Sequence, residues 1–235
     1  MSQTPYVDVG ARDERVWTET KYVQEHFLDL WQAARCGDHW RPRMPYTHEH
    51  KERTRAHIVE CARELFNQRG FVAVSIDEIM TRAGLTRGGF YNHFSSKEEL
   101  FTEAIRSHLA FNPLERWPDI DFDPSRCGKE RARQMINTYL SRKHLDDLEA
   151  QCPMIALPSD VSRASKRVKD AYRELLEHMA TLFSNSVSVP DKRERGLALA
   201  ALCVGGMVLA RSFDDDSLRN DVREAARRTA LELVE

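Results

Sequence analysis

The chain has 235 residues, of which 41% are hydrophobic and 31% are charged, and it contains only 10 glycines. This composition allows a buried core in one large or two small domains, favours a mostly helical protein, and argues against a disordered or collagen-like chain. The formal net charge of -2 excludes a general electrostatic attraction to nucleic acid, so any DNA contact must come from a local patch.

The cysteines are odd in number, lie far apart and include no Cys-x-x-Cys pair: Cys36, Cys61, Cys127, Cys152 and Cys203. Neither a disulfide framework nor a zinc finger is indicated, and we expect no metal and no cofactor. The longest apolar run, Leu197 to Ala210, is shorter than the roughly 20 residues that span a bilayer, and the N-terminus lacks an apolar secretory core. We therefore expect a cytoplasmic protein without a membrane partner.

Residues 1–43 combine charged residues and aromatic residues without a clean period, and Pro42 and Pro45 separate them from the following chain. Residues 16–34 can form one amphipathic helix. We interpret residues 1–43 as an extension of uncertain order. Met44 begins a segment typical of a short basic arm, so it is an alternative translation start.

The first long helix is expected from about His48 to Arg69, with Gly70 ending it. Its buried face comprises Ile58, Cys61, Ala62, Leu65 and Phe66. Arg53 and Arg55, with Lys51, precede this face. They can reach a DNA groove or backbone as basic arms do, or remain solvated surface charges.

Ser75 with Glu78 three positions later predicts a capping box, in which serine oxygen and glutamate each satisfy a free backbone N–H. A short helix is expected to begin there and to end at Gly84, because glycine accepts the left-handed conformation. Its buried residues would be Ile76, Ile79 and Met80. With a turn at Ala83 to Leu85, the pattern predicts a helix-turn-helix.

Thr86 can cap the second helix of this motif, which begins with two glycines, Gly88 and Gly89, although each glycine costs about 1 kcal/mol in a helix. Without a Cβ, these residues allow close approach of the backbone to another surface, and N-terminal N–H groups suit phosphate oxygens. Phe90 and Phe94 can anchor the helix inward. The residues left facing outward are Arg87, Tyr91, Asn92 and His93.

The segment resembles the DNA-binding domain of the TetR family of bacterial transcriptional regulators over roughly residues 50 to 105. The resemblance lies in an alanine in the first helix and in five further groups: Leu65-Phe66, Gly70-Phe71, Ala83-Gly84-Leu85, Tyr91-Asn-His-Phe94 and Ser96-Lys-Glu-Glu-Leu100. It implies a helix-turn-helix DNA-binding domain at 44–95 and a helical effector-binding and dimerisation domain at 96–235. The implied DNA-binding residues are Arg53, Arg55, Ser75, Thr86, Arg87, Gly88, Gly89, Tyr91, Asn92, His93 and Lys97.

Lys97 begins the next helix, which Ser95 or Ser96 caps and which runs toward Asn112-Pro113. A phosphate near Lys97 would interact with the ammonium and with the backbone amides of the helix end. In the family, the matching lysine generally contacts the DNA backbone, and this helix links the two domains.

Four further helical stretches follow a loop, Phe111 to Gly128, that we expect to fold over an apolar surface. The stretches are Lys129–Glu149, Met154–Leu182 with a break near Ser162–Ser165, Lys192–Ser212 and Ser217–Val234. No segment reads as a strand. The predicted fold is therefore all-α, with a three-helix head on a larger helical body.

The run Leu197 to Ala210 is apolar around nearly its whole circumference, and its small residues permit close backbone approach. Asp214 to Asp216 can cap the helix that follows. In the family, the final two helices form a symmetric four-helix dimer contact. The dimer residues expected are Leu199, Leu202, Val204, Gly206, Leu218, Val222 and Ala226.

A small-molecule pocket in the body is expected from aromatic and flexible apolar side chains, with a filled core as the alternative. Its residues would be Trp117, Met135, Tyr139, Cys152, Met154, Leu157, Tyr172, Met179 and Phe183. Because Cys152 precedes Pro153 at an expected helix start, a lowered pKa could make it a reactive thiolate, although a structural cysteine is favoured.

The usual catalytic motifs, including Gly-x-Ser-x-Gly, His-Glu-x-x-His and the nucleotide-binding loops, are missing, so an enzyme is not expected. The resemblance implies a homodimeric transcriptional regulator, a repressor that a small-molecule effector releases from an inverted-repeat operator in double-stranded DNA. The alternative is a helical ligand-binding adaptor or a thiol-based redox or electrophile sensor with little DNA specificity.

Overall fold

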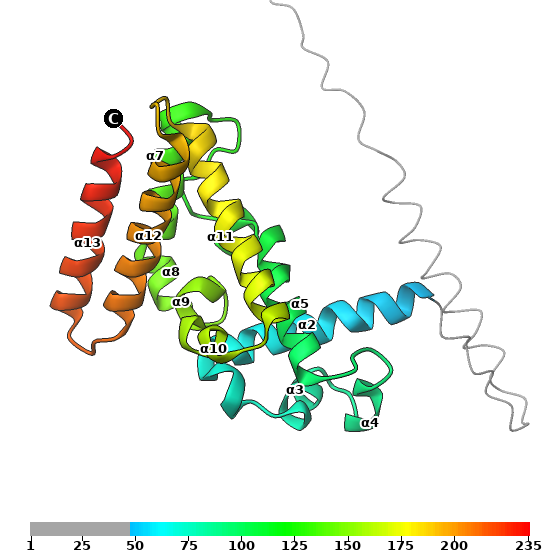
Figure 1. Cartoon of the computed structure of the whole chain (residues 1–235). Coiled ribbons are helices and arrows are strands. Elements are labelled where there is room, and N and C mark those ends of the chain that lie inside the picture. Colours follow the sequence, from blue (N-terminus) through cyan, green and yellow to red (C-terminus); the bar gives the residue numbers. More distant parts are fainter. Residues whose placement is uncertain (1–47) are drawn as a thin grey trace, which may run out of the picture. The chain divides into compact units, whose positions relative to one another are not determined.

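The computed structural model describes residues 48–235, which all belong to one compact unit and contain helices but no strand (Figure 1). The expectations for residues 1–43 and Met44 lie outside the described residues. The helices are α2 (His48–Ala73), α3 (Ile76–Arg82), α4 (Arg87–Phe90), α5 (Lys97–Ser107), the 3-10 turn η1 (His108–Ala110), α6 (Pro113–Arg116), α7 (Gly128–Tyr139), α8 (Arg142–Asp146), α9 (Pro153–Ala156), α10 (Pro158–Arg163), α11 (Lys166–Ser186), α12 (Lys192–Arg211) and α13 (Asp216–Glu232). The all-α prediction is confirmed.

The start of α3 has the predicted capping box. The Ser75 backbone N–H donates to Glu78 Oε2 at 2.7 Å, and the Glu78 N–H donates to Ser75 Oγ at 3.2 Å. Gly84, after the helix, has a φ of 70°, and Gly70 interrupts α2 with a φ of 77°. Both glycines therefore stand where the backbone needs the left-handed region.

The second helix of the motif, α4, has only four residues and continues as a turn to Phe94. Phe90 and Phe94 are buried, as predicted. Thr86 occupies the N-cap position but makes no side-chain capping bond, so the predicted threonine cap is wrong. The cap of α5 is formed by Ser96, whose Oγ accepts from the Glu99 N–H at 3.1 Å.

The structure differs from the expected helix in one segment of the body and agrees with the expected helix break in another. The expected helix over 129–149 is divided, because α7 ends at Tyr139 and Ser141 caps α8 by accepting from the His144 N–H at 3.1 Å. The expected break near Ser162–Ser165 is confirmed between α10 and α11. Both α9 and α10 begin with a proline, which has no N–H to leave unpaired there.

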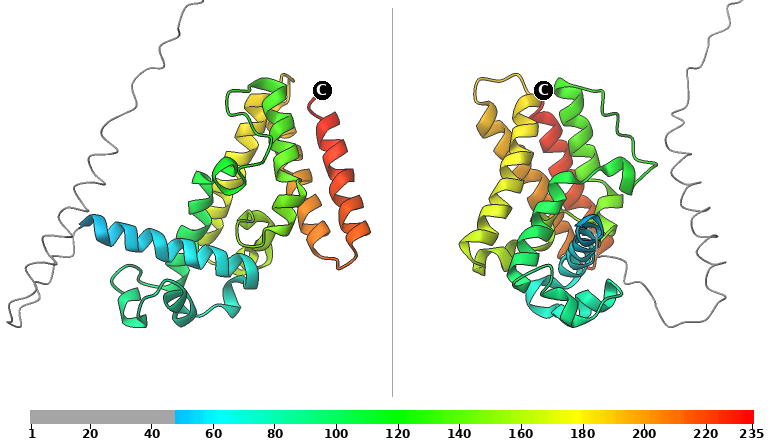
Figure 2. Two further views of the ribbon diagram at one scale, coloured as in Figure 1. Left: turned by 180° about the vertical axis from the view of Figure 1, so that it is seen from behind. Right: turned by 90° about the vertical axis from the view of Figure 1, so that its right-hand side faces the viewer.

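The long helices α11, α12 and α13 pack closely because of two glycines in α12. A Cβ on Gly196 would lie 2.4 Å from the Ala180 carbonyl oxygen in α11, and one on Gly206 would lie 2.5 Å from the Ala226 Cβ in α13. The predicted close backbone approach is confirmed. Figure 2 shows α12 and α13 side by side, on the far side of the body from α4.

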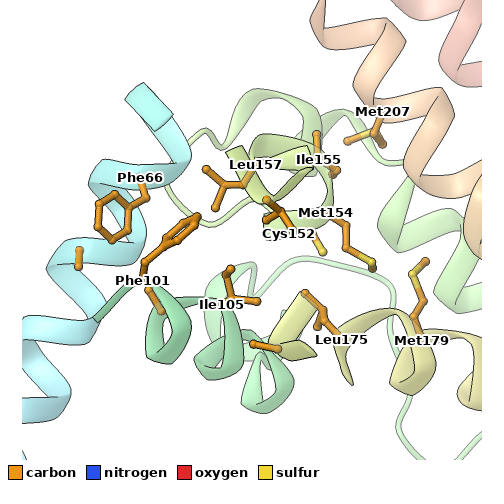
Figure 3. Close-up of a cluster of buried hydrophobic side chains, with 14 of the residues drawn as sticks. Phe66, Phe101, Ile105, Cys152, Met154, Ile155, Leu157, Leu175, Met179 and Met207 are labelled. Atoms are coloured by element: carbon orange, nitrogen blue, oxygen red, sulfur yellow. The ribbon is translucent and has the colours of Figure 1, made fainter. Parts of the chain in front are cut away.

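One core joins the head to the body. Phe66 of α2 meets Phe101 of α5 edge to face, with ring centroids 5.1 Å apart. Figure 3 shows these rings followed by Ile105, by Met154 of α9 and by Leu175 of α11. Buried side chains on both sides of the expected boundary between residues 95 and 96 belong to this one core. A displacement in the body can therefore reach the head through direct contacts.

Candidate nucleic-acid interface and body pocket

The outer surface of α4 and its following turn presents exposed side chains that are not fixed by packing. Tyr91 is 61% exposed, and Arg87, Gly88 and Asn92 are exposed as well. Arg87 Nη1 lies 2.7 Å from Asp77 Oδ2 in an ion pair with both side chains more than half exposed. Such a pair stabilises little, so Arg87 can exchange its partner at small cost.

The glycines of α4 are not required by the protein's own packing. A Cβ on Gly88 would meet nothing within 4 Å, and one on Gly89 would make an ordinary contact of 3.6 Å with Met80 Cε. Neither residue has a positive φ. The open space over Gly88 therefore suits close approach of a second surface, as the sequence predicts.

Arg55 and His93 do not face outward as expected. The Arg55 guanidinium lies 4.1 Å from the centre of the Phe94 ring, donates to the His93 carbonyl oxygen, and is 3.6 Å from Glu99 Oε1. The His93 ring is half-buried with Nδ1 unpartnered, and burial lowers its pKa. The His93 ring is therefore turned partly inward, which corrects its expected outward orientation, and Arg55 braces the turn after α4. DNA contact by either residue stays a prediction.

Ser75 and Lys97 are also engaged within the head. The Ser75 hydroxyl belongs to the capping box. The Lys97 Nζ lies 4.4 Å from the centre of the Phe71 ring, and burial lowers its pKa, against the opposing charges of Glu78 and Asp160. Among the other expected contacts, Arg53 and Thr86 are exposed.

The body contains a cavity of about 480 Å³ between the loop after α5 and helices α7, α9 and α11. Most of the expected pocket residues line it: Trp117, Met135, Tyr139, Cys152, Met154, Met179 and Phe183. Two expected residues do not. Leu157 is buried in the core, and the Tyr172 hydroxyl donates to the Met154 carbonyl oxygen at 3.2 Å.

Part of the wall was not predicted, because chain order does not indicate that η1 and the loop after it line the same cavity as α7. The additional lining residues are His108, Leu109, Phe111, Asn112, Pro113, Phe122, Arg131, Thr138, His144, Leu175, His178 and Leu182. A usable signal was the sequence His108-Leu-Ala-Phe111, which places two rings close together at the end of a helix. These rings stack with centroids 4.8 Å apart.

Aromatic rings continue around the cavity. Phe111 meets Trp117 edge to face at 5.5 Å, Trp117 lies 5.3 Å from His144, and His144 lies 4.8 Å from Tyr139. Rings packed in this way hold their orientations, because each one restricts its neighbour. The wall is therefore rigid where it is aromatic and adaptable where methionines complete it.

His144 is a fully partnered residue in this wall. Its Nδ1 lies 2.7 Å from the Tyr139 carbonyl oxygen, and its Nε2 lies 3.3 Å from the Cys152 backbone nitrogen. Since the Cys152 N–H can only donate, Nε2 accepts and Nδ1 carries the proton. Burial lowers the pKa of His144 to about 4, so the ring is neutral at pH 7.

Cys152 does not have the environment of a reactive thiolate. The helix that follows it, α9, has only four residues, and burial raises the pKa of the Cys152 thiol to about 11, although the neighbouring Tyr139 hydroxyl acts in the opposite direction. The hypothesis of a lowered pKa is wrong, because loss of hydration outweighs the helix end.

Residues 147–152, which we call the connecting segment, join the head to the pocket. On the head side, the Asn67 side-chain N–H donates to the carbonyl oxygens of Glu149 at 3.0 Å and Gln151 at 2.7 Å, and Arg63 donates to the Glu149 carbonyl oxygen at 2.8 Å. Arg82 at the end of α3 forms an ion pair with the Glu149 carboxylate at 3.0 Å.

On the pocket side, the connecting segment makes hydrogen bonds to two residues of the wall, Trp117 and His144. Asp147 Oδ2 accepts from the Trp117 indole N–H at 3.0 Å and pairs with Arg116, whose hydrogen bond lowers the Asp147 pKa to about 2. Cys152, at the other end of the segment, donates its N–H to His144. Hydrogen bonds and ion pairs of the connecting segment therefore reach the pocket wall on one side and α2 and α3 on the other.

Comparisons with known proteins agree with this architecture. Residues 58–104 match the family described as "Bacterial regulatory proteins, tetR family". The head of the chain belongs to the TetR family.

Curated relatives match this chain over different shares of its length. The transcriptional regulator YfiR of Bacillus subtilis is 38% identical over 63 residues, which are 27% of this chain and 31% of YfiR. YerO of the same organism is 26% identical over 165 residues, covering 68% of this chain and 54% of YerO. The transcriptional regulator AcrR of Shigella flexneri is 44% identical over 57 residues, which are 24% of this chain and 26% of AcrR. The chain thus matches about a quarter to a half of these relatives' lengths.

Solved structures extend the likeness to the body fold. The reduced form of Escherichia coli NemR has a TM-score of 0.65 at 19% identity, covering 78% of this chain and 97% of NemR. A TetR regulator from Chloroflexus aurantiacus has a TM-score of 0.62 at 19% identity, covering 78% and 95%. These likenesses extend beyond the head and show the fold of the body.

The outer surface of α12 and α13 corrects part of the expected dimer set. Leu199 and Gly206 are buried inside the protomer and cannot contact a second copy. Leu218 is exposed, and Leu209, which was not expected, is 53% exposed. The exposed apolar side of the body also includes Phe213 and the partly exposed residues Leu202, Val204, Val208 and Val222.

No helix within residues 48–235 is long and apolar enough to cross a membrane. The same residues contain no group of three or more His, Cys, Asp or Glu side chains that could hold a metal ion.

Proposed function

We propose that this TetR-family protein is a homodimeric transcriptional regulator, which a small molecule in the body pocket releases from an inverted-repeat operator. The observation that carries the proposal is the connecting segment, whose hydrogen bonds reach the pocket wall at one end and helices α2 and α3 at the other. A ligand that displaces the wall changes how the body and the head are arranged. If the ligand binds one arrangement more tightly than the other, it shifts the protein toward that arrangement and so changes its affinity for DNA.

DNA binding is supported by the exposed surface of α4. Arg87 presents a guanidinium, which pairs with both acceptors on a guanine edge, and Tyr91 and Asn92 stand beside it in the chain. The open space at Gly88 allows the helix to approach the major groove. In a two-fold dimer, two such helices read half-sites about 34–36 Å apart or a multiple of that distance.

A thiol-based sensor is less well supported than a reversible ligand. Cys152 is buried, its thiol is protonated at pH 7, and its backbone is held by His144. The volume of about 480 Å³ lies within the range of small-molecule sites.

The test begins with selection of binding sites from random double-stranded DNA by the full chain. An inverted repeat should be enriched. Arg87→Ala should then cost about 1–3 kcal/mol and relax the preference at one base pair of each half-site. Asp77→Asn should raise affinity, because it frees Arg87 and removes a negative charge from the DNA-facing surface.

Lys97→Ala is the matched control for a contact to phosphate. A lysine that contacts phosphate should, on removal, weaken binding to all sequences alike and reduce the salt slope by about one. If no inverted repeat is enriched, or if Arg87→Ala weakens specific and random DNA equally, the proposed DNA recognition is wrong.

A further inference from the structure

The body pocket contains three polar atoms that have no hydrogen-bond partner and no contact with solvent. Within the described residues they are Thr138 Oγ1, His108 Nδ1 and Tyr139 Oη, whose one polar neighbour is the Cys152 thiol, a weak hydrogen-bonding group. All three residues line the same cavity, and the rest of its wall is mainly aromatic and apolar. Thr138 is only 9% exposed as a whole residue.

Unpartnered polar atoms are not a general feature of this region. His144 has partners on both nitrogens, and the Tyr172 hydroxyl, outside the cavity, donates to the Met154 carbonyl oxygen at 3.2 Å. A buried hydroxyl or imidazole without a partner costs free energy, which a ligand group recovers when it supplies the missing bond. The unpaired atoms of Tyr139, Thr138 and His108 therefore mark where a ligand's polar group belongs.

The charge state of these groups restricts the ligand. Burial lowers the pKa of His108 to about 3 and raises the pKa of Tyr139 well above its usual range, so both side chains are neutral at pH 7. No carboxylate lines the cavity, and its one arginine, Arg131, is exposed. A charged ligand group placed deep in the cavity would lose its hydration without a counter-ion.

The wall restricts the ligand's shape. His108, Phe111, Trp117, His144 and Tyr139 form a continuous series of neighbouring rings. Ring faces and edges pack best against another flat aromatic system, whose quadrupole complements theirs. Met135, Met154 and Met179 adapt to the remaining outline.

We propose that the pocket binds a neutral, flat aromatic molecule with a hydroxyl group, a phenol, whose hydroxyl pairs with Tyr139, Thr138 and His108. A phenol satisfies these groups because its oxygen accepts from a hydroxyl while its own O–H donates to an imidazole nitrogen. The inference rests on the proposed function only in treating this cavity as the effector site.

Calorimetry at pH 7 tests the proposal. It measures how tightly the full chain binds three probes that share one ring skeleton. The probes are naphthalene, 2-naphthol and 2-naphthoate. 2-Naphthol should bind at least about tenfold more tightly than naphthalene, because one net hydrogen bond contributes about that much. 2-Naphthoate should bind more weakly than 2-naphthol.

Two variants keep an aromatic side chain and remove the polar atoms: Tyr139→Phe removes only the hydroxyl, and His108→Phe replaces the imidazole by a phenyl ring. Tyr139→Phe and His108→Phe should each reduce the preference for 2-naphthol over naphthalene severalfold, with naphthalene affinity retained. Tyr172→Phe is the matched control, because its hydroxyl bonds to Met154 and does not line the cavity. It should keep the preference, and circular dichroism melting checks that each variant is folded.

Equal binding of naphthalene and 2-naphthol, no binding of either, or an unchanged preference in both Tyr139→Phe and His108→Phe would each overturn the proposal. Tighter binding of 2-naphthoate would assign the pocket to an anion held by Arg131 instead. DNA release is measured separately. If 2-naphthol binds with the expected preference but leaves DNA affinity unchanged, the proposed function fails and the ligand class stands. If an apolar compound releases specific DNA without any preference for a phenol, the ligand class alone fails.

Discussion

The glycine at position 88 lowers the stability of helix α4 in the free protein. The protein's own packing does not require a glycine there. The φ of Gly88 is not positive, and an added Cβ would meet nothing within 4 Å. We predict that Gly88→Ala leaves the free energy of unfolding unchanged or raises it by up to about 1 kcal/mol, since alanine favours a helix. DNA affinity should fall, because the methyl group enters the space that DNA approaches.

Thermal melting and operator affinity, measured on the same preparation, separate these effects. Gly84→Ala provides the contrast, because a φ of 70° should make it destabilising by about 1–2 kcal/mol. Unchanged operator affinity in Gly88→Ala would mean that DNA does not approach this side of α4.

His144 gives the protein a dependence of stability on pH. Its folded-state pKa of about 4 lies below the value near 6.5 of an unfolded chain. The neutral ring's contribution is therefore fully present above pH 6.5, and it is lost as pH falls toward 4, by up to about 1.4 kcal/mol per pH unit. His108, with a pKa of about 3, acts in the same direction.

Urea unfolding between pH 7 and pH 4 measures this slope. His144→Gln should be less stable at pH 7, because two hydrogen bonds are disturbed, yet it should show a shallower loss of stability below pH 6.5. A slope equal to that of the unchanged protein would show that His144 titrates normally in the folded state.

At the scale of single residues, the sequence predicted what depends on near neighbours. The capping box needs only Ser75 and Glu78, three positions apart, and it was confirmed. The ring contacts of Arg55 and Lys97 were not predicted, because their partners, Phe94 and Phe71, lie far along the chain. A basic residue's exposure depends on tertiary packing, which local spacing does not contain.

Among the elements, the connecting segment determines how pocket and head communicate. The side-chain amide of Asn67 donates to two carbonyl oxygens of the connecting segment. Arg211 of α12 in turn donates to the Asn67 carbonyl oxygen at 3.2 Å. We predict that Asn67→Ala lowers the free energy of unfolding by about 1–3 kcal/mol, because the buried Gln151 carbonyl oxygen loses its donor, whereas that of Glu149 keeps Arg63. It should also weaken the effect of a pocket ligand on DNA affinity.

The measurement is the ratio of operator affinities with and without 2-naphthol, which gives the coupling free energy between the sites. Gln68→Ala is the control, since its side chain contacts only the exposed carboxylate of Glu149, at 3.0 Å. If Asn67→Ala binds both DNA and ligand and keeps the full coupling, the signal takes another route.

The division of the expected helix 129–149 shows a limit at the element scale. Its apolar spacing continues through residue 145, but Ser141 offers a cap that competes with an uninterrupted helix. The sequence contained this signal, and its effect depended on the packing of Leu140 and Leu145 in the core. Helix existence followed from pattern, whereas helix ends depended on contacts between elements.

In the whole molecule, the pocket could be predicted only in part. Residues on α7, α9 and α11 were identified from helical spacing, but the loop that closes the cavity is held by tertiary bonds. In the amide orientation that satisfies both groups, Gln134 of α7 pairs with the backbone N–H and carbonyl oxygen of Asp123 at 3.1 and 3.0 Å. Phe122, which follows from this loop position and not from any local pattern, lines the cavity beside the expected Trp117.

The outer side of α12 and α13 determines the assembly we expect. Leu209 and Leu218 are exposed apolar side chains on adjacent antiparallel helices, and a Cβ on Gly205 of the same region would meet nothing within 4 Å. The buried side of α12 packs inside the protomer, through Gly196 against α11 and through Gly206 against α13. A second copy related by two-fold symmetry would cover the exposed side with the same residues, because an isologous interface is self-complementary.

We predict that Leu209→Glu combined with Leu218→Glu converts the dimer to a folded monomer, because each copy would place two carboxylates in an apolar contact. Light scattering after size exclusion measures the mass, and melting confirms folding. Val72→Glu, at a site 81% exposed in the head, is the control and should remain dimeric. The monomer should bind an isolated half-site but lose the preference for the inverted repeat, since that preference needs two heads held at a fixed distance. A double variant that stays dimeric would place the interface on another surface of the body.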